Sequence, residues 1–130
     1  MTGRRPPVRR RRARPVLVLR SRRAPARMTP AQAAAWEVCR AIDTGLLPTL
    51  RQPDVDRIAV RSHLGAVALR IVRHRSLWGE HGAMLVAGLH CAMGLFGLGE
   101  HADLAGLARD LSDRLYLLSI TPGEPDHRPE

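Results

Sequence analysis

The chain contains no lysine and no asparagine in 130 residues, and only four aromatic side chains. We interpret these absences as a GC-rich coding bias, which favours Arg, Ala, Gly and Pro. Because arginine then also does the surface work of lysine, a single arginine carries little functional information. Hydrophobic residues make up 45% of the chain, which is enough for the core of one domain of about 100 residues. With few aromatics, that core must be built from Leu, Ala and Val.

Acidic residues are missing from the first 27 positions, where eleven arginines lie. The rest of the chain holds the other ten arginines and all twelve acids, so the net charge of +9 comes from the N-terminal segment. Like charges and four prolines predict that residues 1–28 form a disordered, Arg/Pro-rich tail. A basic tail of this kind is typical of polyanion binding. The candidate polyanion-binding residues are Arg4, Arg5, Arg9, Arg10, Arg11, Arg12, Arg14, Arg20, Arg22, Arg23 and Arg27.

A second interpretation of this tail stands beside the first. Met28 directly precedes a strong helix start at Thr29 and Pro30, and an upstream start codon is easily assigned in error in a GC-rich gene. On this interpretation the native protein begins at Met28 and the tail has no function.

Cysteine is scarce, and its spacing is uninformative. Cys39 and Cys91 form no C-x-x-C pair, and no secretory signal precedes them. We therefore expect a reduced, cytoplasmic protein with two buried thiols, and a Cys39–Cys91 disulfide is the alternative.

Apolar residues recur at helical spacing through the rest of the chain, which predicts an all-α fold. Thr29, Pro30 and Gln32 are typical of a capped helix start, and Gly45 of a helix end. We expect a four-helix bundle over residues 29–120, followed by a disordered tail over 121–130. The predicted helices are 29–44, 53–76, 80–98 and 101–119.

The third predicted helix has no charged residue between Gly82 and Gly99. A helix that is apolar all round is expected to lie buried at the centre of the bundle. A membrane span is the alternative, because the run is near the minimum length for one. Its small residues predict a helix-packing interface in either setting. These residues are Ala83, Ala87, Gly88 and Ala92.

No motif predicts a reaction. Glu80-His81 and Glu100-His101 repeat as candidate metal ligands, but each pair starts a helix, so the two pairs should lie at opposite ends of the bundle. A DNA-reading helix-turn-helix within Leu104–Tyr116 would need a turn for which the leucine spacing leaves no room. We therefore expect no enzyme activity, no catalytic residue, no metal and no cofactor.

Three segments resemble small all-helical actinobacterial proteins of unknown function, some of them encoded near natural-product genes. They are Arg61-Ser-His-Leu-Gly, the Ala- and Cys-containing helix 80–98, and Leu107-Ala-Arg-Asp-Leu-Ser-Asp-Arg-Leu-Tyr116. The resemblance covers about residues 36–118 and implies the helical fold but no activity.

These observations favour a non-catalytic accessory or regulatory protein. We expect it to act through helix-mediated protein contacts, with self-association as the main one. The alternative is a nucleic-acid-associated protein that binds polyanions through the arginine tail.

Overall fold

The first helix begins where the sequence predicts it. The computed structural model describes residues 27–122, and Thr29 caps helix α2 (Pro30–Ala41). The Thr29 hydroxyl accepts a hydrogen bond from the Gln32 backbone N–H at 3.1 Å. The Gln32 side-chain oxygen accepts one from the Thr29 N–H at 2.9 Å. The predicted capping box is therefore confirmed.

The prediction that Gly45 ends this helix is wrong. The chain continues through one π-helical turn, η1 (Ile42–Leu46), into α3 (Leu47–Leu50). A Cβ atom at position 45 would lie 2.7 Å from His63 Nδ1. Gly45 thus allows the His63 ring of the next helix to lie against the π turn. A glycine that serves a close approach looks the same in the sequence as one that ends a helix.

Helix α4 (Arg57–His74) begins four residues later than the predicted start at Pro53. The Asp56 carboxylate sets this start, because Oδ1 accepts hydrogen bonds from the backbone N–H groups of Ile58 at 3.0 Å and Ala59 at 3.2 Å. A short 3₁₀ turn, η2 (Arg75–Trp78), follows α4.

The last two helices agree with the sequence prediction almost to the residue. Helix α5 (Glu80–Leu98) lies between Gly79 and Gly99, which both have positive φ angles, of 58° and 76°. Helix α6 (His101–Ile120) runs without a break. A helix-turn-helix in this segment is therefore excluded.

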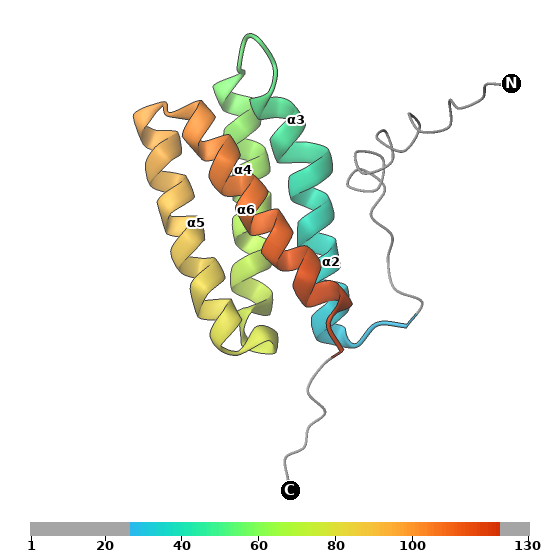
Figure 1. Ribbon diagram of the computed structural model, residues 1–130. Helices are drawn as coiled ribbons and strands as arrows, with labels where there is room; N and C mark the ends of the chain where they lie inside the picture. The colour runs from blue at the N-terminus through green and yellow to red at the C-terminus, as the bar shows by residue number, and fades with distance from the viewer. Residues whose placement is uncertain (1–26, 123–130) are drawn as a thin grey trace, which may run out of the picture.

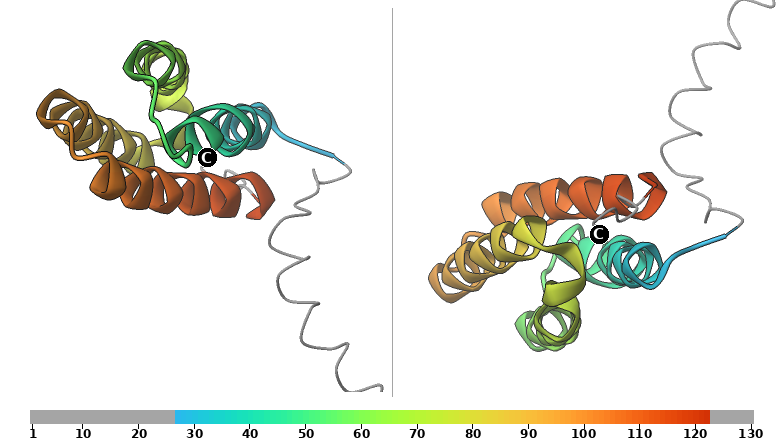
Figure 2. Two further views of the ribbon diagram at one scale, coloured as in Figure 1. Left: turned by 90° about the horizontal axis from the view of Figure 1, so that it is seen from above. Right: turned by 90° about the horizontal axis from the view of Figure 1, so that it is seen from below.

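The four long helices run alternately up and down, as Figure 1 shows. Seen along their length, α2 packs beside α4 and α6, and α5 packs beside α4 and α6 (Figure 2). The prediction of an all-α fold with four helices is confirmed for residues 27–122, which contain no strand. The described chain enters and leaves the bundle at the same end, where α2 begins and α6 ends.

The most extensive contact in the bundle is between α2 and α6. Gln32 Nε2 donates to the Thr121 carbonyl at 2.8 Å, the rings of Trp36 and Tyr116 lie 6.4 Å apart, and Cys39 Sγ lies 3.4 Å from Ser112 Oγ. The two helices are therefore antiparallel neighbours along the length of α2 and the second half of α6. Small buried residues on both allow this close approach, namely Ala34, Ala35, Ala108 and Ser112.

The prediction that helix 80–98 is the buried centre of the bundle is wrong. Only Gly82, Leu85, Leu89 and Ala92 of α5 are buried. The opposite side of the helix is exposed although it carries no Asp, Glu, Lys or Arg after Glu80. Within residues 27–122, α5 packs against α4, α6 and the adjoining turn η2, and no other helix of this part of the chain covers its outward side. Among residues 27–122, α5 is also the one helix long and apolar enough to cross a membrane.

Of the glycines in residues 27–122, Gly82 leaves the least room for a Cβ atom, and we expect it to be intolerant of substitution. A Cβ atom at this position would collide with the Arg75 carbonyl, a backbone group that cannot move aside alone. Gly82→Ala should therefore lower the free energy of unfolding by about 1–3 kcal/mol, as overpacking does elsewhere. Denaturant unfolding measures the change.

Gly65 on α4 provides the matched control, because a Cβ atom there would meet nothing within 4 Å. Gly65→Ala should raise the free energy of unfolding by up to about 1 kcal/mol, since alanine favours a helix interior. Equal effects of the two substitutions would contradict the close contact at Gly82.

Candidate functional site

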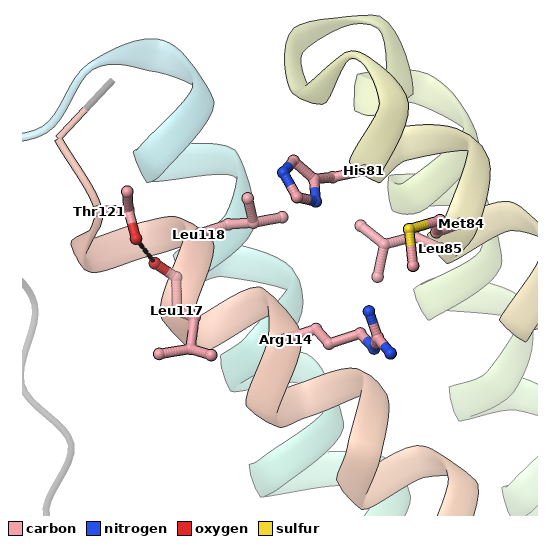
Figure 3. A pocket seen from close by; sticks show the side chains of 7 residues that line it. All are labelled: His81, Met84, Leu85, Arg114, Leu117, Leu118 and Thr121. Atoms are coloured by element: carbon pink, nitrogen blue, oxygen red, sulfur yellow. Dashed lines mark hydrogen bonds between the residues drawn. The ribbon is translucent and has the colours of Figure 1, made fainter. Parts of the chain in front are cut away.

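A hollow of about 320 Å³ lies between the first turns of α5 and the last turns of α6. Figure 3 shows His81, Met84 and Leu85 of α5 lining it on one side, and Arg114, Leu117 and Leu118 of α6 with Thr121, the next residue after that helix, on the other. Antiparallel packing brings these segments together, because α6 ends at the end of the bundle where α5 starts. The volume falls in the range of about 300–1,000 Å³ that is usual for small-molecule sites.

The walls of this hollow differ in chemistry. Leu85 is buried and forms part of the hydrophobic core, whereas Met84 is 49% and Leu117 57% exposed. The guanidinium of Arg114 and the imidazole of His81 face the same space (Figure 3). Within residues 27–122 neither side chain makes a hydrogen bond or an ion pair. The hollow therefore combines an apolar floor with one guanidinium and one imidazole.

A second, wider hollow of about 590 Å³ adjoins the first and shares His81, Leu118 and Thr121 with it. Its other walls come from the start of α2 and from the turn before α5, and they include Glu80. The Trp78 Nε1–H donates to the Ala31 carbonyl at 3.0 Å, which ties that turn to α2. Together with the bond from Gln32 to the Thr121 carbonyl, this contact holds the walls of both hollows in place.

The π turn positions a separate polar cluster in the interior. The Ser112 hydroxyl of α6 donates to Asp43 Oδ1 at 2.6 Å, and Cys39 Sγ lies 3.7 Å from Asp43 Oδ2. Thiol, hydroxyl and carboxylate together are the residue types of nucleophilic catalysis. However, Cys39 and Ser112 are at most 1% exposed, so a substrate cannot reach them. The cluster instead links α2 to α6 in the bundle interior.

The two cysteines lie in different environments, and the prediction of two buried thiols is wrong for one of them. Cys39 is buried, but Cys91 is exposed on the outward side of α5. Its exposure follows from the peripheral position of that helix. Neither residue is part of a disulfide.

Most of the predicted polyanion-binding residues lie outside the described part of the chain. Of the eleven arginines, only Arg27 belongs to residues 27–122, and it is exposed just before the α2 cap. Arg4, Arg5, Arg9, Arg10, Arg11, Arg12, Arg14, Arg20, Arg22 and Arg23 fall in the undescribed segment 1–26.

The predicted helix-packing residues are divided between two sides of α5. Ala92 is buried, and Gly88 faces α6, since a Cβ atom there would lie 2.8 Å from Leu111 Cδ2. Ala83 and Ala87 are exposed on the outward side. The small residues therefore serve one contact inside the bundle and leave a second surface without a neighbour.

The two Glu-His pairs start α5 and α6 and thus lie at opposite ends of the bundle. Within residues 27–122 no three His, Cys, Asp or Glu side chains are grouped so that they could hold a metal ion.

Comparisons of the chain with protein-family models, with curated proteins and with solved structures find no match. What the chain does must therefore be argued from its own surfaces.

We expect the buried cluster to contribute to stability. Ser112→Ala removes the donor to Asp43, and the loss of a hydrogen bond to a carboxylate typically costs about 1.5–3 kcal/mol. The free energy of unfolding, measured by urea titration, should fall by that amount. The control is Ser62→Ala on the exposed side of α4, which should change it by less than about 0.5 kcal/mol. If both substitutions were neutral, the cluster would not link the two helices.

Proposed function

We propose that this chain is a non-catalytic accessory protein that associates with a second copy of itself through the outer face of α5. That face consists of Ala83, Ala87, Cys91, Gly94 and Leu98, which follow one another at helical spacing and are all exposed. One observation carries the proposal: a helix with no charged residue from Gly82 to Leu98 lies at the edge of the bundle instead of inside it.

Leaving this surface in water is unfavourable. Leu98 is 75% exposed, and the neighbouring α4 adds Ile58 at 77% and Leu69 at 60%. Covering apolar surface is worth roughly 25 cal/mol per Å². Large exposed apolar patches are rare on monomeric soluble proteins and usually mark an interaction site. Binding of a partner that covers α5 and the adjoining side of α4 would therefore be favoured by the burial of this apolar surface.

A second copy is the partner that fits this face best. The outer face of α5 carries no charge, so it has no electrostatic pattern with which to select a different protein. Its small residues allow another helix to approach closely, and the same stripe on the second copy is equally flat and apolar. Two copies related by a twofold axis would bury identical surfaces, as in most homodimers.

A bilayer would also cover an apolar helix, but the neighbours of α5 disfavour that environment. A membrane deep enough to cover α5 would reach exposed arginines on the helices packed against it, among them Arg61, Arg73 and Arg109. An arginine at the centre of a bilayer costs about 2.5–3.5 kcal/mol or more.

The decisive variant is Gly94→Arg. A side chain at position 94 would meet nothing within 4 Å inside the monomer, so the fold should tolerate it. A charge in the centre of the proposed interface should shift the dimer to monomer, with the dissociation constant raised at least about 100-fold, since an unpaired buried charge costs about 3–5 kcal/mol. Sedimentation velocity over a concentration series measures the mass.

Gly106→Arg on α6 is the matched control, because that position also has no neighbour within 4 Å and lies on another helix. It should leave the dimer intact. A monomeric native chain, or dissociation by both variants alike, would contradict the proposal. A native chain that stays in solution only with detergent would indicate the bilayer instead.

A second candidate function rests on charge. We propose that the arginine tail binds polyanions such as nucleic acid, and eleven arginines without an acid in residues 1–27 support this. With about half of them engaged on duplex DNA, log K should fall with log salt at a slope of roughly −4 to −6. Sequence preference should be small, because phosphate contacts do not read bases.

Gel shifts or fluorescence anisotropy at several salt concentrations measure this slope. The chain shortened to begin at Met28 should fold equally well and lose the binding. Specific DNA binding by the shortened chain, or a slope near zero for the full chain, would refute this candidate.

A further inference from the structure

We propose that the hollow between α5 and α6 is a binding site for an amphiphilic carboxylate, a molecule with one anionic head and a short hydrocarbon chain. Self-association uses the outward side of α5, whereas this hollow opens at the end of the bundle between α5 and α6. The two proposals rest on different residues and are independent of each other.

Arg114 indicates that the ligand has an anionic head. Its guanidinium faces the hollow and has no partner within residues 27–122. Arginine presents a planar fork of donors that matches the two oxygens of a carboxylate. His81 reaches the same space from α5 and offers a further donor (Figure 3).

The apolar floor of the hollow indicates that the ligand carries a hydrocarbon chain. Met84 from α5 and Leu117 from α6 are half-exposed side chains that line the hollow, and the less exposed Leu85 and Leu118 line it beside them. A hydrocarbon chain would cover this surface as it leaves the water. A small inorganic anion would satisfy Arg114 but would leave the floor exposed.

One acidic group fixes the orientation of the ligand. Glu80 lines the wider hollow beyond His81 and repels an anionic head from that end. The head therefore lies at Arg114, and a longer chain extends past Leu118 toward Leu77 and Trp78, the apolar walls of the wider hollow.

The test uses octanoate as the probe, below its micelle-forming concentration, in isothermal titration calorimetry on the full chain. 1-Octanol and octylammonium have the same hydrocarbon chain with a neutral or a positive head. Octanoate should bind at least tenfold more tightly than octanol, and octylammonium should bind more weakly still. Equal binding of octanoate and octanol, or no binding of octanoate, would overturn the proposal.

Two substitutions test whether the anionic head of the ligand binds at Arg114. Arg114→Gln keeps a polar side chain and removes the charge, so octanoate should bind about 10- to 100-fold more weakly, the range expected for a hydrogen bond to a charged group. Arg109→Gln removes the same charge from the same helix outside the hollow and should leave binding unchanged. If both variants weakened binding equally, general attraction by the basic chain would account for it.

A third variant tests the site without removing its cation. Leu117→Glu places a carboxylate one helical turn from Arg114, at a position exposed enough to accept it. Octanoate binding should be lost while the helical circular dichroism spectrum stays unchanged. The Gly94→Arg variant should bind octanoate as the native chain does, so the failure of either proposal can be recognised separately.

Discussion

The close antiparallel packing of α2 against α6 is the contact on which the rest of the structure depends. A chain with four aromatic residues cannot fill a core with large rings, so it gains stability by bringing backbones near each other. Alanine and serine on the facing sides permit this approach, and the contact between Cys39 Sγ and Ser112 Oγ crosses it. Helices α4 and α5 then pack on the remaining sides. Because α4, α6 and the turn η2 are the main contacts of α5 in the described part of the chain, no other described helix covers its outward side.

The sequence predicts the helices well and their depth in the bundle poorly. The capping box at Thr29 and the glycines before α5 and α6 are local signals, and each one marks a real helix end. Gly45 gives the same local signal, but it serves the approach of His63 on another helix. Hydropathy likewise indicates that burial of α5 would be favourable, whereas the number of helices packed against α5 determines how much of it is buried. Both errors therefore concern contacts between distant segments.

The hollow at the end of the bundle could not have been read from the sequence for the same reason. His81 belongs to a Glu-His pair that suggests a metal ligand, and Arg114 follows Asp110 at the spacing of an ordinary helical ion pair. Only the antiparallel arrangement of α5 and α6 brings the two side chains to one space. The apolar run 82–98 could be seen in the sequence, but its exposure on one side of the bundle could be seen only in the structure. The arginine tail, by contrast, is a property of composition alone.

The central claim is that the outer face of α5 is covered by a second copy of the chain. Hydrogen–deuterium exchange at several protein concentrations tests it most directly on the unmodified protein. Amides of α5 should exchange more slowly as the concentration rises, because association stabilises that helix, while those of α2 and α6 should change little. Exchange in α5 that does not depend on concentration would contradict the account.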